Sequence, residues 1–425
     1  MNKNRTSLSF SDAQKISSPK SFSTLVKPVG SNCNMRCTYC YYLDKSLLYE
    51  HQTPTSVMSD KLLEEYIAQY IEANDIDTVT FCWHGGEPLL AGIKFYEKAI
   101  YYQKKYAKGK KIENTLQTNG LLINDEWCKF FKRNNLLVGI SIDGPEDIHD
   151  TYRINMGGGA TFSKVMRAVE RLTCNGVEFN TLSVVNDKCK GRGAEIYNFF
   201  KSIGSRYMQF LPAVEFVSGD DIEKLGGRGK ILAPENASAG ALSPWSIDAL
   251  DFGEFMCDIF DTWIQKDVGE YFVQMFDVTL ANWYGVKPGL CAFAKSCGDG
   301  LVVEFNGDVY SCDHFVYPEY LLGNIERDHL RSIYSSKRQF RFGIAKRNDL
   351  PVECMRCKYY FACTGGCPKH RFGRTATSPK ANILCEGYKM FFNHVHPYMD
   401  KMCDLLRKNQ QVSDIMKFVS INQKL

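Results

Sequence analysis

The sequence predicts an α/β protein: a partial (β/α)6 barrel followed by a cysteine-rich C-terminal domain. Between about residues 23 and 215, short apolar segments alternate six times with segments whose apolar residues recur at helical spacing. This alternation is typical of a parallel sheet with right-handed crossovers. Six units are too few for a closed eight-stranded barrel, so an open or partial barrel is expected. From residue 291 to 385, eight cysteines lie where apolar periodicity is weak, and inorganic cross-links would supply the missing stability there.

The expected strands are short runs rich in β-branched and aromatic residues. They are Thr24–Val29, Thr78–Trp83, Thr115–Thr118, Leu137–Ile142, Phe179–Val185 and Met208–Val214. Amphipathic helices are expected between them. The first carries Leu62, Leu63, Tyr66, Ile67, Tyr70 and Ile71 on one face, and the others lie near 93–107, 124–134, 162–174 and 194–203.

Composition divides the chain into five segments. They are a flexible polar leader (1–22), the barrel (23–245), a helical connection (246–290), the cysteine-rich domain (291–390) and a helical tail (391–425). Within the barrel segment, residues 218–245 are rich in Gly, Ser, Ala and charge. Such a composition predicts a loop or a mobile insertion.

Composition and charge exclude several classes of protein. The 425 residues are 44% hydrophobic and 24% charged, which is ordinary for a globular protein. Lys and Arg number 52 against 48 Asp and Glu, so charge gives no reason to expect a nucleic-acid or membrane partner. No apolar run approaches the ~18 residues of a membrane span. The polar N-terminus lacks the apolar core of a signal peptide, so a cytoplasmic location is expected.

Cysteine usage is the outlier, with 17 residues. An odd number excludes complete internal pairing, and clustered cysteines in a reducing cytosol more often bind metal. Three of them, Cys33, Cys37 and Cys40, form a C-x3-C-x2-C group near the N-terminus. Eight lie in the C-terminal region: Cys291, Cys297, Cys312, Cys354, Cys357, Cys363, Cys367 and Cys385. The other six are scattered and are expected to pack as small buried hydrophobes.

The first cysteine group follows the first expected strand at its carboxyl end, the edge where catalytic groups collect in parallel α/β proteins. Thiolates are soft ligands that suit iron–sulfur clusters or zinc. A four-iron cluster with three protein thiolates leaves one iron open for a substrate or cofactor. A structural zinc site would want four ligands, and His51 is the candidate for the fourth.

The segment Cys33-Asn-Met-Arg-Cys37-Thr-Tyr-Cys40 resembles the cluster loop of the radical S-adenosylmethionine (SAM) superfamily. The cysteine-rich tail resembles the SPASM extension of its peptide-modifying members. Together they are most similar to the anaerobic sulfatase-maturating enzymes, over roughly Ser23 to Cys385. The resemblance implies a radical SAM barrel, an iron–sulfur C-terminal domain, three [4Fe–4S] clusters and SAM. SAM would bind the open iron, and one electron would cleave it to a 5′-deoxyadenosyl radical that takes a hydrogen atom from the substrate.

Further motifs follow other expected strands. Gly85-Gly86-Glu87-Pro88 follows the second, and the resemblance implies that this segment, with Gly86, holds the SAM amino group, because glycine allows close backbone approach. The alternative is a strand–helix turn in which Pro88 opens the helix. His84 precedes the glycines and either touches substrate or packs in the core.

The resemblance also assigns the rest of the SAM site. Ser141, in the Ser-Ile-Asp-Gly motif after the fourth strand, and Arg153 would bind the SAM carboxylate, which suits a hydroxyl and a guanidinium. Tyr39, beside the cluster, and Val214, after the sixth strand, would help to seat the adenine. The alternative for Arg153 is a solvated surface residue. Gln117-Thr118-Asn119-Gly120 brings further polar side chains to the end of the third strand.

The resemblance divides the tail cysteines between two auxiliary clusters, although spacing alone would pair neighbours. One set is Cys291, Cys297, Cys312 and Cys367, and the other is Cys354, Cys357, Cys363 and Cys385. Four thiolates close a cubane cluster and leave no open iron; the alternative is a pair of structural zinc ions. Asp313 follows Cys312 directly and is a candidate general base, or else an ordinary turn residue.

The function implied is oxidation of a cysteine or serine of a sulfatase polypeptide to formylglycine without oxygen. The radical would take a hydrogen atom from Cβ, Asp313 would take the thiol or hydroxyl proton, and an auxiliary cluster would accept the electron. A donor such as flavodoxin or ferredoxin would supply reducing electrons. One alternative is a maturase that forms a thioether or crosslink in another ribosomal peptide, although a 22-residue leader is too short for the peptide-binding domain such enzymes often carry. Another is a non-catalytic iron–sulfur or zinc protein, against which the three-cysteine loop argues.

Overall fold

The computed structural model of the chain describes residues 21–49, 53, 55–219, 229–375 and 378–422. The chain forms two compact units, each assembled from segments far apart in the sequence. Unit 1 comprises the described parts of Met1–Cys33, Lys45–Leu116 and Ser296–Asp349. Unit 2 comprises those of Asn34–Asp44, Gln117–Lys295 and Leu350–Leu425. The boundary between them falls inside the cluster loop, directly after Cys33.

The sheet of unit 1 contains parallel and antiparallel parts. Its strands follow the order β3-β2-β1-β11-β12-β13. β1 pairs in parallel with β2 and with β11, and β2 pairs in parallel with β3, whereas β11–β12 and β12–β13 are antiparallel. The strands span Ser23–Lys27 (β1), Thr78–Trp83 (β2), Lys111–Thr118 (β3), Gly300–Glu304 (β11), Asp308–Tyr310 (β12) and Leu321–Asn324 (β13).

Helix α2 (Asp60–Ala73) of unit 1 forms where the sequence predicts one. Ser59 caps its N-terminus by accepting a hydrogen bond from the Leu62 amide, which satisfies a donor that the first turn leaves free. All six apolar residues predicted for its face are buried. The other helices of the unit are α3 (Ile93–Tyr106), α10 (Leu330–Tyr334) and α11 (Lys337–Asn348).

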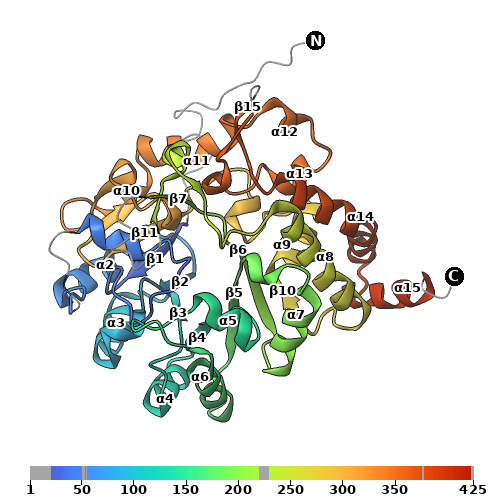
Figure 1. Cartoon of the computed structure of the whole chain (residues 1–425). Helices are drawn as coiled ribbons and strands as arrows, with labels where there is room; N and C mark the ends of the chain where they lie inside the picture. Colours follow the sequence, from blue (N-terminus) through green and yellow to red (C-terminus); the bar gives the residue numbers. More distant parts are fainter. Residues whose placement is uncertain (1–20, 50–52, 54, 220–228, 376–377, 423–425) are drawn as a thin grey trace. The chain divides into compact units, whose positions relative to one another are not determined.

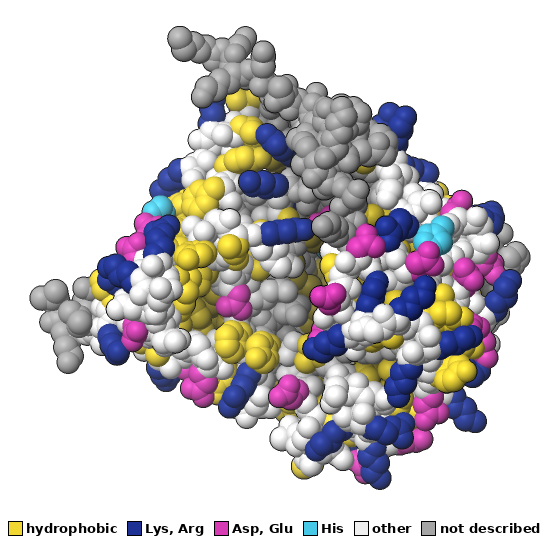
Figure 2. Space-filling model, turned by 180° about the vertical axis from the view of Figure 1, so that it is seen from behind, with side chains coloured by type: hydrophobic (Ala, Val, Ile, Leu, Met, Phe, Trp, Pro, Cys, Tyr) yellow, Lys and Arg dark blue, Asp and Glu magenta, His cyan; other side chains and the backbone are white. Residues whose placement is uncertain are grey.

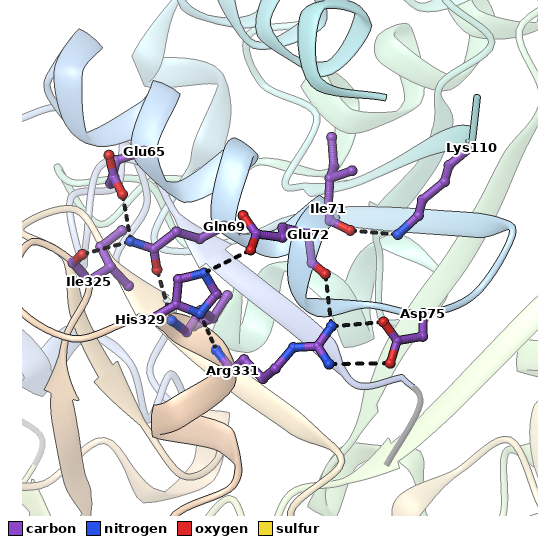
Figure 3. Close-up of polar contacts among 10 residues, drawn as sticks. Glu65, Gln69, Ile71, Glu72, Asp75, Lys110, Ile325, His329 and Arg331 are labelled. Atoms are coloured by element: carbon purple, nitrogen blue, oxygen red, sulfur yellow. Dashed lines mark hydrogen bonds and ion pairs between the residues drawn. The ribbon is translucent and has the colours of Figure 1, made fainter. Parts of the chain in front are cut away.

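Polar contacts join α10, and the segment that precedes it, to α2 (Figure 3). The Gln69 amide accepts a hydrogen bond from the Leu330 N–H at 2.8 Å and donates one to the Ile325 carbonyl at 3.1 Å. Arg331 forms a two-pronged ion pair with Asp75, at 2.8 and 3.3 Å. The C-terminal cysteine-rich region is therefore bonded directly to the first helix of the barrel region.

Unit 2 has a parallel sheet of order β10-β6-β5-β4. Its strands span Leu137–Ser141 (β4), Phe179–Val185 (β5), Tyr207–Pro212 (β6) and Phe272–Val273 (β10). Its helices are α4 (Asp125–Arg133), α5 (Glu146–Tyr152), α6 (Phe162–Cys174), α7 (Gly193–Ser202), α8 (Ala249–Lys266), α9 (Gln274–Tyr284), α12 (Val352–Arg356), α13 (Tyr360–Cys363), α14 (Cys385–Arg407) and α15 (Ile415–Asn422).

Helices α8 and α14 lie side by side in unit 2 (Figure 1). They cross at two glycines, Gly253 and Gly387. A Cβ on Gly387 would lie 1.8 Å from the Ala249 carbonyl oxygen, so only glycine permits this separation. The crossing holds α14, which begins at the predicted cluster ligand Cys385, against a helix of the predicted helical connection.

The predicted α/β fold is confirmed strand by strand. Thr78–Trp83 and Phe179–Val185 begin and end where the sequence predicts, and the third strand starts earlier, at Lys111. Helix α5 and strand β11 were not predicted. β11 is almost wholly buried and pairs with β1, so the cysteine-rich region contributes a strand to the same sheet as the start of the barrel.

The segment predicted as a loop or mobile insertion contains short strands. β7 (Phe216–Ser218) pairs antiparallel with β8 (Lys230–Ile231) and with β9 (Ala241–Leu242). Strands of two or three residues are too short for alternation to reveal them in the sequence. Residues 220–228 of this segment and 1–20 of the predicted leader lie outside the described residues.

No helix in the described part of the chain is long and apolar enough to cross a membrane. Basic and acidic side chains are interspersed over the face drawn in Figure 2. This mixture agrees with the small net charge of +4.

Candidate active site

The cluster loop is held by backbone pairing with the segment that follows α5 in unit 2. The Arg36 N–H donates to the Ile154 carbonyl at 2.8 Å, and the Thr38 N–H donates to the Tyr152 carbonyl at 2.9 Å. Because α5 ends at Tyr152, this pairing carries the next residue, Arg153, to the loop. The predicted carboxylate-binding arginine and the predicted cluster loop are thus positioned by the same contacts.

Arg153, Tyr39 and Asp143 form a buried polar group in unit 2. The Tyr39 hydroxyl donates to Asp143 Oδ2 at 2.6 Å and accepts from Arg153 Nη1 at 2.8 Å. Arg153 Nη1 also lies 3.7 Å from Asp143 Oδ1. Burial raises the pKa of Asp143, and the Arg153 charge and the Tyr39 hydrogen bond oppose this. Arg153 is therefore a buried residue, which excludes the alternative of a solvated surface arginine.

This group fits an anionic ligand. Arg153 Nε is buried and has no hydrogen-bond partner among the described residues. A buried guanidinium N–H without an acceptor is costly, and a ligand carboxylate would satisfy it with a charge-assisted bond. The donor set thus suits the carboxylate of SAM, which the resemblance assigns to Arg153.

Ser141 and Val214, the other predicted SAM residues of unit 2, lie at the ends of strands. Ser141 closes β4, and its Oγ accepts a hydrogen bond from Gln117 Nε2 at 2.9 Å. Val214 follows β6 and is buried, while its neighbour Ala213 packs with Tyr39 and Trp245. The region expected to seat the adenine is therefore apolar and includes the tyrosine predicted for it.

Gly86 lies in unit 1, where it is bonded to the start of the cluster loop. The Gly86 N–H donates to the Gly30 carbonyl and the Glu87 N–H to the Asn32 carbonyl, both at 2.8 Å. A Cβ on Gly86 would lie 2.0 Å from the Asn32 carbonyl oxygen. Pro88 also opens a short 3-10 helix, Pro88–Ala91, so the predicted strand–helix turn is present, and the nearby Asn32 carbonyl requires glycine at position 86.

Lys27 joins Asp313 and His84 in unit 1. Lys27 ends β1 and is fully buried, and its Nζ lies 2.6 Å from Asp313 Oδ1. His84 Nδ1 is 3.1 Å from the same ammonium and accepts the Gly85 N–H at 2.8 Å. Burial and the Lys27 charge lower the pKa of His84 to about 4. Burial raises the pKa of Asp313, but the charge and hydrogen bond of Lys27, together with smaller contributions from His84 and His314, hold this pKa well below its usual range.

The sequence alone did not identify Lys27 or Asp143 as parts of the site. Each is a charged residue at or just beyond the end of an apolar run, where a strand boundary explains it equally well. The signal was nevertheless present, because polar residues at the carboxyl ends of parallel strands are candidates for function.

Two thiols of the cluster loop, Cys37 and Cys40, lie within electrostatic range of each other in unit 2. Burial raises the pKa of Cys37 to about 12, although the Arg153 charge opposes this. A thiol in this state gives up its proton when a metal binds. The third cysteine, Cys33, belongs to unit 1, and His51, the candidate zinc ligand, lies outside the described residues.

The second auxiliary set is brought together in unit 2. The thiol of Cys363 interacts electrostatically with those of Cys354, Cys357 and Cys385. Burial raises its pKa to about 12, and the three other thiols add to this. Four neighbouring cysteines are the donor set of a closed cubane cluster. Among the described residues, no three His, Cys, Asp or Glu side chains are close enough to share one metal ion. A four-iron cluster is wider than a single ion, so this spacing does not exclude it.

The loop between Cys363 and Cys367 is shaped by neighbouring side chains. Gly365 and Gly366 adopt φ of +80° and +64°, which favour glycine. Their carbonyls accept hydrogen bonds from Arg371 at 3.3 and 3.4 Å. Cys367 itself caps the short 3-10 helix Pro368–His370. Of the first auxiliary set, Cys291 and Cys367 belong to unit 2, and Cys297 and Cys312 to unit 1.

Comparison with known proteins assigns the family. The model of the radical SAM superfamily matches residues 28–187, and that of an iron–sulfur cluster-binding domain, SPASM, matches residues 291–358. The serine-type anaerobic sulfatase-maturating enzyme of Bacteroides thetaiotaomicron is 50% identical over 396 residues, 92% of this chain and 94% of that one. The chain belongs to the anaerobic sulfatase-maturating enzymes. A cysteine-type member from Clostridium novyi is 34% identical over 376 residues, 88% of this chain and 95% of that one.

A solved structure of the same family matches the fold. Native anSMEcpe with bound AdoMet superposes with a TM-score of 0.77 at 31% identity, over 90% of this chain and 99% of that one. The predicted family, fold, enzyme class and cofactors, three [4Fe–4S] clusters and SAM, are therefore confirmed. The reaction of this family, conversion of a sulfatase serine or cysteine to formylglycine, is the one predicted from the sequence. The roles of individual residues and the five predicted segments remain predictions.

Proposed function

We propose that this enzyme oxidises a serine of a sulfatase polypeptide to formylglycine, with Asp313 as the acceptor of the hydroxyl proton. The preference for serine is supported by the higher identity to a serine-type relative, 50%, than to a cysteine-type relative, 34%. The role of Asp313 is supported chiefly by its ion pair with the buried Lys27 at 2.6 Å, which holds a carboxylate in place beside a predicted cluster ligand.

The residues of the chain divide the work of the reaction. The bound clusters and SAM supply the electron and the radical that removes a hydrogen atom from the substrate Cβ. Arg153 and Ser141 bind the SAM carboxylate, Gly86 offers its backbone to the amino group, and Tyr39 and Val214 enclose the adenine. A serine hydroxyl does not ionise at neutral pH, so its proton must be taken as the carbonyl forms. The carboxylate of Asp313 accepts it.

A low-potential donor such as flavodoxin or ferredoxin supplies the electrons in this proposal. Because cluster thiolates and such donors require reducing conditions, we expect the reaction in the cytoplasm. Cys291, Cys297, Cys312 and Cys367 would hold one auxiliary cluster, and Cys354, Cys357, Cys363 and Cys385 would hold the other. When bound, these clusters would supply an acceptor for the electron that leaves the substrate.

A pair of sulfatase-derived peptides that differ only in serine or cysteine at the target position tests the substrate. Anaerobic incubation with reconstituted enzyme, SAM and reductant is followed by mass spectrometry. We expect the aldehyde to form faster from the serine peptide. Faster turnover of the cysteine peptide would overturn the preference, and the absence of aldehyde from both would overturn the proposed reaction.

Asp313→Asn tests the proton acceptor, because it keeps the size and removes the basicity of the side chain. We expect SAM cleavage to continue while aldehyde forms at least ~100-fold more slowly, the loss typical of a missing general base. Asp308→Asn makes the same chemical change in the β12 turn of unit 1, where Asp308 accepts hydrogen bonds from Asn306 and Asn324, and is the control. Parent yields of both products from Asp313→Asn would exclude Asp313 from the mechanism.

A further inference from the structure

A second buried ion pair lies in unit 2, between Glu215 and Lys369. The Lys369 ammonium bonds to Glu215 Oε1, and both side chains are less than one-tenth exposed. The same ammonium stands over the ring of Tyr41, 4.6 Å from its centroid. Burial of two charges is costly, and such a pair often contributes less stability than well-packed apolar residues would. Its presence therefore calls for an explanation other than stability.

The three residues of this group come from the three segments that carry the chemistry. Tyr41 directly follows Cys40 of the cluster loop, Glu215 directly follows Val214, and Lys369 lies two residues after Cys367. Lys369 sits in the short 3-10 helix that Cys367 caps. The backbone of Glu215 is held in place, because its N–H donates to Ser246 Oγ at 3.0 Å and its carbonyl accepts the Ser243 N–H at 2.8 Å.

We propose that Lys369, held by Glu215, sets the reduction potential of the auxiliary cluster to which Cys367 belongs. A buried positive charge near an iron–sulfur cluster stabilises the added electron, because net charge is one of the factors that fix the potential of such clusters. Lys369 thereby makes this cluster a better acceptor for the electron that leaves the substrate. Glu215 has the opposite effect and limits the shift. Both are positioning residues of the acceptor site.

The size of the effect follows from the charge. Lys369 lies two residues after Cys367, so their Cα atoms are at most ~7.6 Å apart. For a unit charge roughly 10 Å from the cluster and an effective dielectric constant of about 20, the ratio of reduced to oxidised cluster changes about tenfold at fixed potential. This inference rests on the proposed assignment of Cys367 as a cluster ligand.

Redox titration of the anaerobically reconstituted enzyme, followed by electron paramagnetic resonance, tests the proposal. SAM is added so that the cluster with the open iron can be separated from the auxiliary clusters. We expect Lys369→Met to make one auxiliary cluster about tenfold harder to reduce and Glu215→Gln to make it easier to reduce, as expected for removal of one charge of either sign. The double variant and Lys369→Arg should titrate like the parent.

Lys201→Met is the matched control. Lys201 forms a similarly buried ion pair with Asp267 at 2.5 Å and stands 4.8 Å from the Tyr271 ring centroid, also in unit 2. It adjoins no predicted cluster ligand in the sequence, so its loss should leave every potential unchanged. If the Lys369–Glu215 pair were merely structural, Lys369→Met and Lys201→Met would have the same effect. Bound iron would fall, and the two single variants of the pair would show no potential shifts of opposite sign.

Each outcome decides between these explanations. Unchanged potentials, or shifts in the same direction for both single variants, would overturn the proposal, and so would loss of cluster iron in the single and double variants alike. If only Lys369→Met loses iron, the reduction potential of Glu215→Gln decides: a shift supports the proposal, and an unchanged potential overturns it. Cys367→Ser separates this inference from its premise, because an untouched auxiliary signal in that variant would overturn the ligand assignment itself.

Discussion

Replacing Gly86 with alanine is expected to abolish productive SAM binding while the surrounding fold survives. The added Cβ would lie 2.0 Å from the carbonyl oxygen of Asn32, 2.5 Å from its carbonyl carbon and 2.6 Å from the Ser31 carbonyl oxygen. All three atoms belong to backbone, which cannot swing aside as a side chain would. The Gly86 segment or the start of the cluster loop must therefore move.

The cost of this movement can be worked from the contacts. Overpacking of this kind costs about 1–3 kcal/mol. The two backbone hydrogen bonds that join Gly86 and Glu87 to the loop contribute about 1 kcal/mol each. Together they amount to roughly 3–5 kcal/mol, which at 1.4 kcal/mol per factor of ten corresponds to at least ~100-fold weaker SAM binding.

Two assays measure the effect: equilibrium binding of SAM to the reconstituted enzyme, and release of 5′-deoxyadenosine. Gly109→Ala is the control, because Gly109 also lies in unit 1, has a φ of +85° and has nothing within 4 Å of the added Cβ. Its substitution adds left-handed backbone strain, which Gly86→Ala does not, but causes no clash. If Gly86→Ala, with its iron intact, bound SAM within about threefold of the parent, the close-approach argument would be refuted.

Three further predictions concern the clusters, the proton acceptor and the surface of unit 2. Changing all three cysteines of the cluster loop to alanine should lower bound iron by about one third, as one cubane of three is lost, and stop SAM cleavage; persistent cleavage would contradict the assignment. Lys27→Met strands the Asp313 carboxylate, so aldehyde should fall at least ~10-fold while deoxyadenosine persists, and combination with Asp313→Asn should add little further loss; additive losses would separate the two residues. The hydrogen bond to Asp261 raises the pKa of His394 against the effect of burial, so its stabilising effect is present at low pH and is lost as pH rises through the raised value. His394→Ala should therefore lower the thermal inactivation temperature more at pH 6 than at pH 9, and equal losses would refute the linkage.

The barrel strands could be predicted because they are short runs rich in β-branched and aromatic residues. Thr78–Trp83 and Phe179–Val185 are such runs, and both strands have the predicted bounds. The cysteine spacings likewise predicted the cluster loop and the family. These are local signals, and a single sequence reports local signals best.

Contacts between distant segments could not be predicted in this way. β11 is a five-residue run whose partner, β1, lies near the other end of the chain, and nothing in its own pattern identifies that partner. Lys27 likewise lies inside the predicted strand Thr24–Val29, and only the fold places it beside Asp313. The grouping of Cys363 with Cys354, Cys357 and Cys385 also depends on the fold, since spacing alone favours neighbouring cysteines.

The pairing of β1 with β11 also governs the order of events during synthesis. The Ser23 hydroxyl donates to the Asp299 carbonyl across 276 residues. At about 5–20 residues per second, a ribosome needs roughly 14–55 s to make that stretch. Until then β1 has an open edge, which is prone to pair with other chains. Cys33 lies just beyond β1, so we expect the first cluster to be inserted only into completed chains, and nascent chains that stop before residue 300 to aggregate without it.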